Sequence, residues 1–346
     1  MFNLQEKLRK NIRDLEPYSS ARDEFQGIAS VYLDANENPF NNGINRYPDP
    51  LQEELKTKIK SIKKVHPEQI FLGNGSDEAI DLLIRAFCEP GEDNIVSIKP
   101  TYGMYKVCAD INHVEYREAP LKSGFNIDIP ALLSLIDNKT KLLFLCSPNN
   151  PTGNCLAQTD IIRILDLFNG ILIIDEAYID FAPGKSLVPL INSYPNLVVL
   201  QTFSKAWGMA GIRLGMAFGT RNIIEVLNRI KYPYNINVLT QQKAAEQLMQ
   251  EEEKNKQVDT IIKERENLVL NLNKLDFVEE MYRSDANFVL VKVKDAKATY
   301  NYLLEKGIIV RDRSRVALCE NSLRITVGTE EENKALINEL TNYKPV

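Results

Sequence analysis

Strand-like and helix-like segments alternate along residues 51–219, and this alternation limits the possible folds more than any other feature of the sequence. The strand-like segments are short and almost entirely apolar, as in residues 140–146 and 170–174. Such runs are typical of strands buried on both faces, because helices cover each side of a parallel sheet. Segments with helical spacing lie between them, such as residues 76–91, which end at Pro-Gly. The sequence therefore predicts an α/β fold with a mostly parallel central sheet flanked by helices.

Two further segments flank this region. Residues 1–45 are predicted to form an N-terminal arm, with one short charged helix followed by a stretch rich in Asn and Pro. Residues 46–240 are predicted to form the large domain. A long polar helical stretch over residues 241–275 then leads into strand-like and helix-like segments that indicate a smaller α+β domain, so residues 241–346 are predicted to form a C-terminal domain with the long helix as its connector.

Composition narrows the partners and the cellular setting. The chain of 346 residues carries a net charge of −5, which argues against a nucleic acid or an anionic membrane surface as its partner. Its five cysteines are scattered without a C-x-x-C pair, which favours reduced thiols over a disulfide framework. The charged start of the chain has no apolar core of a signal peptide. We therefore expect a cytoplasmic protein with small-molecule substrates and no metal.

Polar or flexible residues end four of the predicted strands. These ends read FLGNGSDE, LCSPNNPTG, LIIDEAY and VVLQTFSK, and ligands collect at the carboxyl ends of strands in open α/β sheets. In the first, Gly73 and Gly75 permit a tight turn, and a helix starting at Ser76 would offer free N–H groups to an anion such as phosphate. An ordinary strand-to-helix turn is the alternative, and the stretch matches neither common nucleotide-binding motif.

Two other strand ends carry an acid and an amine. Asp175 follows a buried run and needs a cationic partner or hydrogen bonds, although a helix cap or a structural salt bridge is the commoner fate of such a residue. Lys205 would lose its preference for the charged form if buried, whereas an isolated lysine is usually a surface residue. The hydroxyls of Thr202 and Ser204 and the guanidinium of Arg213 lie nearby in sequence. Pyridoxal 5′-phosphate (PLP) requires this set, namely a lysine, an acid for its ring nitrogen and a phosphate cradle.

Three motifs together resemble those of class I/II aminotransferases of PLP fold type I: SPNNPTG at 147–153, IIDEAY at 173–178 and SKAWGMAGIRLG at 204–215. The resemblance covers essentially the whole chain in the family's order. Within the family, the chain is similar to the branch that acts on histidinol phosphate, through stretches such as LDANENPF at 33–40 and LRITVG at 323–328. The resemblance implies a large PLP-binding domain with a mostly parallel sheet, a smaller α+β domain and an N-terminal arm.

The resemblance also implies cofactor-binding roles. Lys205 would bind PLP covalently and then carry the proton during catalysis. Asp175 would pair with the pyridinium nitrogen, while Tyr178 and Asn150 would donate hydrogen bonds to the phenolic oxygen of the ring. Further cofactor contacts would come from Tyr102 on the ring face and, around the phosphate, from Ser76, Asp77, Thr202, Ser204 and Arg213.

Substrate and partner contacts are implied in the same way. Tyr47 would reach the cofactor phosphate of a neighbouring subunit, which makes the active unit a homodimer with shared active sites. Arg324 would face the phosphate of histidinol phosphate or the carboxylate of glutamate, since an arginine fork suits either anion. Tyr18 and Arg311 are candidate phosphate contacts, or else a packing aromatic and a surface charge. Asn36 would line the substrate entrance or simply form a turn.

The activity that the resemblance implies is transamination of L-histidinol phosphate with 2-oxoglutarate, giving imidazole-acetol phosphate and glutamate in histidine biosynthesis. Three alternatives stay open from the sequence. An aromatic amino-acid aminotransferase and a threonine-phosphate decarboxylase would both keep the lysine and the aspartate. A non-catalytic regulator with a PLP fold would need a DNA-binding segment, and the first 45 residues are too few for one.

Overall fold

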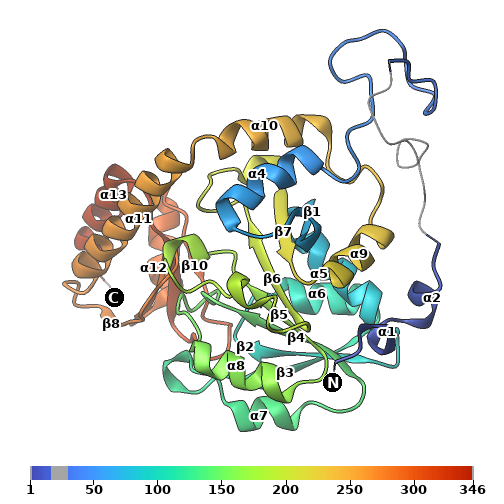
Figure 1. Ribbon diagram of the computed structural model, residues 1–346. Coiled ribbons are helices and arrows are strands. Elements are labelled where there is room, and N and C mark those ends of the chain that lie inside the picture. Colours follow the sequence, from blue (N-terminus) through green and yellow to red (C-terminus); the bar gives the residue numbers. More distant parts are fainter. Residues whose placement is uncertain (1, 17–29, 345–346) are drawn as a thin grey trace.

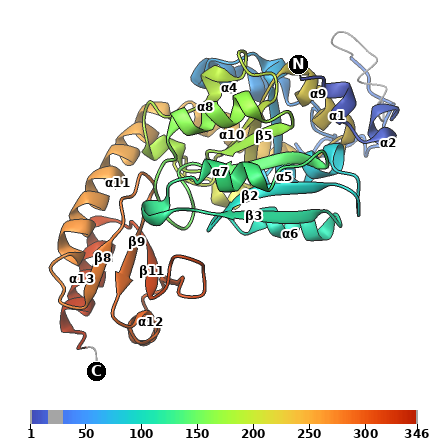
Figure 2. The same cartoon turned by 90° about the horizontal axis from the view of Figure 1, so that it is seen from below.

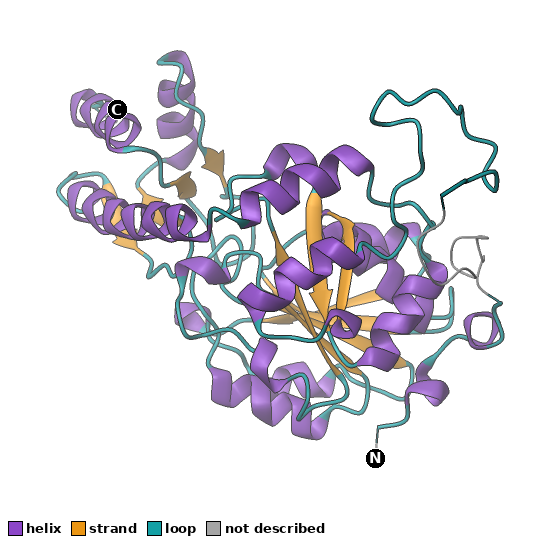
Figure 3. Ribbon diagram, turned by 45° about the horizontal axis from the view of Figure 1, so that its top comes forward, coloured by secondary structure: helices purple, strands orange, loops and turns teal. Residues whose placement is uncertain are grey.

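Two separate β-sheets with surrounding helices make up the protein (Figure 1). The computed structural model describes residues 2–16 and 30–344. Figure 3 shows the strands of the larger sheet enclosed by helices, with the smaller sheet set to one side. The predicted α/β class with a mostly parallel central sheet is confirmed. The domain boundaries expected near residues 45 and 240 stay predictions.

The larger sheet contains seven strands within the described residues, in the order β1-β7-β6-β5-β4-β2-β3. Strands β3, β2, β4, β5 and β6 run parallel, whereas β7 is antiparallel to both β1 and β6. Because β7 reverses direction, the chain that follows β6 returns beside β1, and Gly73 pairs with Gly215. The strands are β1 (Ile70–Asn74), β2 (Asn94–Lys99), β3 (Glu115–Pro120), β4 (Thr140–Cys146), β5 (Ile171–Asp175), β6 (Leu197–Thr202) and β7 (Leu214–Phe218).

Helices bury both faces of this sheet, which explains why its central strands, such as β4 and β5, are almost entirely apolar. In β4, Leu143 and Leu145 belong to the core on one face, while Leu142 and Phe144 belong to the core on the other. This alternation follows from the two-residue period of a strand. The first core also contains residues of α4 (Glu53–Lys63), α7 (Ile129–Ser134), α8 (Gln158–Leu167) and α10 (Val238–Leu248), and the second contains residues of α5 (Gly75–Phe87), α6 (Met104–Ile111) and α9 (Arg221–Ile230) (Figure 2).

The smaller sheet is antiparallel and has its own core. Its described strands are ordered β10-β11-β9-β8, and they are β8 (Val278–Met281), β9 (Phe288–Val293), β10 (Arg311–Asp312) and β11 (Ser322–Thr326). Val289, Val291 and Leu323 pack in this core against residues of α11 (Glu251–Leu272), α12 (Ala296–Glu305) and α13 (Glu330–Asn342). The sheet therefore has a separate apolar core from that of the larger sheet.

The polar stretch over residues 241–275 forms two helices instead of one. The break falls at Gln250, after which three glutamates occupy the first turn of α11 and favour a helix start there. Ala244 and Leu248 of α10 pack in the core of the larger sheet, whereas Leu268 of α11 packs in the core of the smaller one. The two helices thus pack against different sheets. Short 3-10 helices occur at η1 (Pro67–Gln69), η2 (Ser123–Phe125), η3 (Ile179–Phe181), η4 (Val188–Leu190) and η5 (Ala210–Ile212).

The N-terminal residues begin against the larger sheet and then leave it. Two one-turn helices, α1 (Leu4–Lys7) and α2 (Lys10–Arg13), stand where one short helix was predicted, and Leu8 and Ile12 bury their side chains in the core beside α5. The segment over residues 30–51 extends away from the sheets at the upper right of Figure 1. In the described part of the chain, no helix combines the length and the apolarity needed to cross a membrane.

Candidate active site

Segments from four strand ends of the larger sheet meet in one pocket, as the sequence predicts. Parallel strands present their carboxyl ends at one edge, so the loops after β4, β5 and β6 and the turn after β1 lie together there. The residues that line this pocket are Gly75, Ser76, Asp77, Tyr102, Cys146, Asn150, Asp175, Ala177, Tyr178, Thr202, Ser204, Lys205 and Arg213. Ten of the residues singled out from the sequence are therefore brought together.

Asp175 ends the central strand β5 and is only 2% exposed. The hydroxyl of Tyr105 donates a hydrogen bond of 2.7 Å to its Oδ2, and the N–H of Ala177 donates one of 3.1 Å to its Oδ1. Burial raises the pKa of Asp175 to about 6, although both hydrogen bonds act in the opposite direction. Among the described residues, no cationic side chain lies within ion-pair distance of it. A buried carboxylate without a cationic side chain beside it is suited to bind a positively charged group of a ligand.

Lys205 follows β6 in a tight turn. The hydroxyl of Thr202 accepts a hydrogen bond of 3.1 Å from the N–H of Ser204, and the N–H of Gly208 bonds the carbonyl of Lys205 at 3.0 Å. The Nζ of Lys205 lies 5.5 Å from the centre of the Tyr178 ring. Partial desolvation by the pocket walls, followed by nearby arginine charges, lowers the pKa of Lys205. A lysine with a lowered pKa is a better nucleophile toward a carbonyl carbon at neutral pH.

The turn from β1 into α5 forms a cradle with Arg213. Gly75 has φ +70°, and its N–H donates a 2.7 Å hydrogen bond to the carbonyl of Arg213. A Cβ at Gly75 would lie 2.8 Å from Nη2 of Arg213, and one at Gly215 would lie 2.2 Å from the backbone nitrogen of Ser76. Only glycines permit this close approach. The first N–H groups of α5 and the Arg213 guanidinium therefore lie together, an arrangement that favours an anion.

Asp77 and Tyr102 complete one side of the pocket. The Tyr102 hydroxyl donates a 3.1 Å hydrogen bond to Asp77, whose other oxygen lies 3.6 Å from Nη2 of Arg213. The Tyr102 ring meets the Tyr105 ring edge-on, with centroids 5.6 Å apart. Burial, and then the charge of Asp77, raise the pKa of Tyr102, so this side chain is a neutral donor at physiological pH.

The smaller sheet contributes an arginine to the site. Arg324 of β11 donates a 2.6 Å hydrogen bond to Oδ1 of Asn150, whose Nδ2 lies 3.3 Å from the Tyr178 hydroxyl. Phe288 of β9 packs against both Tyr178 and Arg324. Its ring centroid lies 5.1 Å from that of Tyr178 and 5.3 Å from the guanidinium carbon of Arg324. These residues form a chain of contacts that crosses from one sheet to the other.

Three arginines gather at the edge of the smaller sheet. Arg311 of β10 is directly opposite Arg324 in the antiparallel register, so both side chains point to the same face. Arg313 comes two residues later, and its Nε is buried without a hydrogen-bond partner among the described residues. Burial, and then the charges of Arg313 and Arg311, lower the pKa of Arg324. In the described parts of the chain, no carboxylate forms an ion pair with any of the three.

Two contributors were missed by sequence reasoning. Tyr105 lies inside the stretch PTYGMY, but nothing in that stretch distinguishes it from a packing aromatic. Arg313 belongs to VRDRSR, where arginine recurs at every second position, and this strand-like period could have placed it on the same face as Arg311.

Two other predicted residues lie away from this pocket, and a third falls outside the described residues. Tyr47 is half exposed and stacks on Tyr234 with ring centroids 4.5 Å apart. Asn36 is exposed, with φ +55°, which fits its interpretation as a turn residue. Tyr18 lies outside the described residues. The roles proposed for these residues stay predictions.

The donor set matches the chemical requirements of PLP. Asp175 is buried without a cationic partner in the described chain, Lys205 has a lowered pKa, and the glycine cradle brings the start of α5 beside Arg213. These are the partners that a pyridinium nitrogen, an aldehyde carbon and a phosphate need. Tyr178 and Asn150 are positioned between them as polar groups of the pocket wall.

This sheet order, with a lysine and a buried aspartate at the strand ends and an arginine from a second sheet, defines an α/β transferase of fold type I. The chain belongs to the aminotransferase class I and II family, whose model matches residues 24–340. It is 56% identical over 345 residues to the histidinol-phosphate aminotransferase of Bacteroides thetaiotaomicron, covering 99% of this chain and 100% of that protein.

Other relatives agree with this assignment. The chain is 54% identical over 346 residues to the histidinol-phosphate aminotransferase of Cytophaga hutchinsonii, and the match covers 99% of each protein. The crystal structure of the histidinol-phosphate aminotransferase from Clostridium acetobutylicum is 28% identical and superposes with a TM-score of 0.80, covering 86% of this chain and 90% of that one. The resemblance read from the sequence motifs is thereby confirmed at the level of the family.

Proposed function

We propose that this protein is a PLP-dependent aminotransferase that converts L-histidinol phosphate and 2-oxoglutarate into imidazole-acetol phosphate and glutamate, a step of histidine biosynthesis. The near-full-length identity to relatives with that name supports the reaction. One structural observation carries the choice of substrate: Arg311, Arg313 and Arg324 share one edge of the smaller sheet without a carboxylate partner in the described chain.

The charge of this cluster fits a phosphate better than a carboxylate. A phosphate monoester carries close to two negative charges at pH 7, whereas the α-carboxylate of an ordinary amino acid carries one. A pair of opposite unit charges 4 Å apart is worth about 4 kcal/mol at an effective dielectric constant of 20. Arg324, whose pKa is lowered by burial and by Arg313, therefore gains more from a dianion. Arginine also binds phosphate oxygens through two parallel hydrogen bonds.

The remaining residues are proposed to hold the cofactor and move the proton. PLP supplies an electron-accepting ring when it is bound. Asp175 would keep the ring nitrogen charged, and the cradle of Gly75 and Arg213 would bind the phosphate together with Ser76, Asp77, Thr202 and Ser204. Tyr178 and Asn150 would donate hydrogen bonds to the phenolic oxygen, and Tyr102 would cover the ring. The Nζ of Lys205 would hold the aldehyde carbon of the cofactor, and the lysine would also carry a proton from the substrate carbon to the cofactor.

We also propose a homodimer in which Tyr47 reaches the cofactor phosphate of a second copy. The segment over residues 30–51 extends away from the sheets (Figure 1). Several of its large apolar side chains are exposed. Leu33 is 88% exposed and Phe40 is 80% exposed. Apolar side chains gathered on one protruding segment mark an interaction surface. Light scattering coupled to size exclusion should give twice the chain mass, and a Phe40→Glu variant should shift the population toward monomer.

We also propose that the protein works in the cytoplasm. All five cysteines are free thiols in the structure, and four of them are buried. Reduced thiols of this kind are typical of proteins in a reducing compartment.

The direct test is a steady-state assay of glutamate formation from 2-oxoglutarate with a panel of amino donors. L-Histidinol phosphate should exceed phenylalanine in kcat/KM by at least a hundredfold, because only the former supplies a dianion to the arginines. Preference for phenylalanine would overturn the substrate, and release of carbon dioxide from threonine phosphate would overturn the reaction class. Lys205→Ala should abolish both turnover and the absorbance of covalently bound cofactor.

A further inference from the structure

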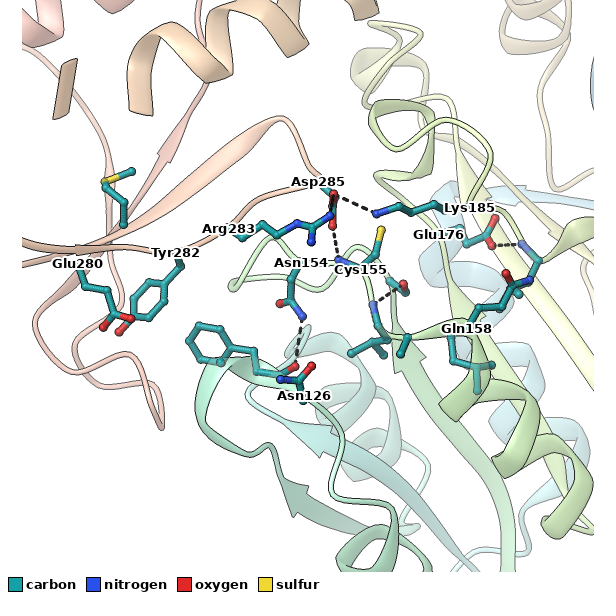
Figure 4. Close-up of a pocket in the computed structure, with 18 residues that line it drawn as sticks. Asn126, Asn154, Cys155, Gln158, Glu176, Lys185, Glu280, Tyr282, Arg283 and Asp285 are labelled. Carbon is teal, nitrogen blue, oxygen red and sulfur yellow. Dashed lines mark hydrogen bonds and ion pairs between the residues drawn. The ribbon is translucent and has the colours of Figure 1, made fainter. Parts of the chain in front are cut away.

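A cleft of about 660 Å³ lies between loops of the larger sheet and the segment that joins β8 to β9 (Figure 4). Residues of the larger sheet's loops, such as Cys155 and Lys185, line one wall, and residues that precede β9, such as Arg283 and Asp285, line the other. Figure 4 shows the Asp285 carboxylate reaching across toward both Cys155 and Lys185. Asp285 therefore reaches across the cleft, and the rings of Phe125 and Tyr282 also meet across it, with centroids 5.0 Å apart.

Asp285 is tied to the opposite wall by backbone as well as side-chain contacts. Its N–H donates a 2.7 Å hydrogen bond to the carbonyl of Gly153, and its Oδ2 accepts one of 2.8 Å from the N–H of Cys155. Its Oδ1 lies 3.2 Å from Nζ of Lys185 and 3.5 Å from Nη2 of Arg283. Burial opposes ionisation, but the Cys155 N–H and Lys185 outweigh it and lower the pKa of Asp285. The carboxylate is thus a charged acceptor at neutral pH.

The segment that Asp285 holds is a closed turn with Asn150 inside it. The N–H of Gly153 bonds the carbonyl of Asn149 at 2.7 Å, and the N–H of Asn149 bonds the carbonyl of Asn154 at 2.9 Å. Gly153 has φ +85°, and a Cβ on it would lie 2.7 Å from Oγ of Ser284. The turn is therefore pressed directly against the residue that precedes Asp285, and it has little room to shift.

The same sheet also holds the active-site end of this turn. Arg324 donates its 2.6 Å hydrogen bond to Asn150 from β11, and β11 pairs with β9, which begins three residues after Asp285. The turn is consequently fixed at both ends by one rigid sheet, with Arg324 at the pocket and Asp285 at the cleft. Movement at either end would shift the amide that faces Tyr178.

We propose that Asp285 is a positioning residue for catalysis, which keeps Asn150 in register with Tyr178 and Arg324 by clamping the backbone of residues 153–155 to the smaller sheet. The role rests on the proposed function, in which the Asn150 amide donates to the phenolic oxygen of the cofactor. Asp285 itself does not line the pocket that contains Lys205. A displacement of about 1 Å at a positioning group can reduce turnover a hundredfold, so the clamp has a measurable consequence.

A simple salt bridge between Asp285 and Lys185 is the competing explanation. The Lys185 side chain is 42% exposed, and exposed ion pairs contribute little to stability. The backbone contact to Cys155 is the specific one, and an asparagine can preserve it, because its amide oxygen is still an acceptor. Asp285→Ala, Asp285→Asn and Lys185→Met therefore separate the two explanations.

The experiment compares these three variants with Asn150→Ala and the parent enzyme. Asp285→Ala should lower kcat/KM for the amino donor ten- to a hundredfold, mainly through kcat, and should raise the pH at which the bound cofactor's absorbance titrates, as Asn150→Ala does. In cofactor-free Asp285→Ala, the amide of Cys155 should exchange with deuterium at least tenfold faster than in the cofactor-free parent enzyme. Asp285→Asn should bring kcat/KM, the pH of the absorbance titration and the exchange rate of the Cys155 amide most of the way back to the parent values. Lys185→Met should leave all three quantities near the parent values.

The outcomes are distinguishable from failure of the proposed function. Hydrogen exchange at Cys155 and the absorbance titration do not depend on which amino donor is used, so they test the clamp even if histidinol phosphate is not the substrate. The proposal is overturned if Asp285→Ala only lowers thermal stability while the titration of the cofactor and kcat of the folded enzyme stay unchanged. It is equally overturned if Lys185→Met reproduces the full effect of Asp285→Ala.

Discussion

Asp175 is held in a state that costs stability, and replacing it by asparagine should therefore stabilise the cofactor-free protein. The side chain is 2% exposed, and burial raises its pKa from the usual 3.8 to about 6. The folded protein thus binds this proton more tightly than the unfolded chain does. Stability of the parent protein consequently falls as the pH rises from about 4 to about 6, where the carboxyl group ionises.

The size of the effect follows from the same pKa difference. A rise from 3.8 to about 6, at 1.36 kcal/mol for each pKa unit, corresponds to roughly 3 kcal/mol once the group is fully ionised. At pH 5 the corresponding cost is only about 1.5 kcal/mol. Asparagine can keep both local contacts, since its oxygen accepts from the N–H of Ala177 and its NH₂ group can donate to the Tyr105 hydroxyl. The advantage of Asp175→Asn should therefore grow with pH.

The assay is urea unfolding of cofactor-free protein at pH 5 and pH 8. Asp175→Asn should gain about 3 kcal/mol at pH 8 and about half of that at pH 5, while losing affinity for PLP because the neutral amide cannot pair with a charged ring nitrogen. Adding PLP should reverse the order of stability by stabilising only the parent protein. The reasoning is refuted if the variant is less stable at pH 8, or if the difference is the same at both pH values.

Three further variants test the cradle, the arginines and the buried hydrogen bond. Gly215→Ala should cost about 1–3 kcal/mol in urea unfolding and weaken PLP binding, because its Cβ would lie 2.2 Å from a backbone nitrogen of α5, whereas Gly211→Ala has open space and should be near neutral. Arg313→Gln should raise KM for histidinol phosphate about tenfold, whereas Arg315→Gln, at an exposed position, should leave KM unchanged. Equal effects of the two substitutions would contradict a specific contact between Arg313 and the substrate. Tyr105→Phe should raise the dissociation constant of PLP about tenfold or more, since it removes a 2.7 Å hydrogen bond to the buried carboxylate, and an unchanged constant would count against that role.

The sequence predicted the strand ends well because buried parallel strands have an unambiguous pattern. The run before Asp175 could only be a strand covered on both faces, and the sheet rule then placed that carboxylate beside Lys205. These predictions depend on local pattern and on one topological rule, so a single sequence suffices for them.

Features that depend on pairing between distant segments were missed. The antiparallel direction of β7 cannot be read from its five apolar residues, because a strand buried on both faces looks the same in either direction. The break at Gln250 depends on which sheet covers each helix, and the three glutamates that follow it are also compatible with one continuous polar helix. The role of Asp285 depends on a contact with residues about 130 positions earlier, which sequence periodicity does not encode.

The pairing of β1 with β7 has a consequence for how the chain acquires its cofactor during synthesis. Gly75, which directly follows β1, has no anion cradle until Arg213 has been synthesised. In the sequence, β2 to β6 lie between these two residues. A ribosome makes β1 well before β7, so β1 must wait as an unpaired edge while β2 to β6 emerge. Pairings between such distant strands form slowly, and exposed edges invite aggregation. PLP can therefore bind in this cradle only after β7 has been made, so it cannot stabilise a shorter nascent chain.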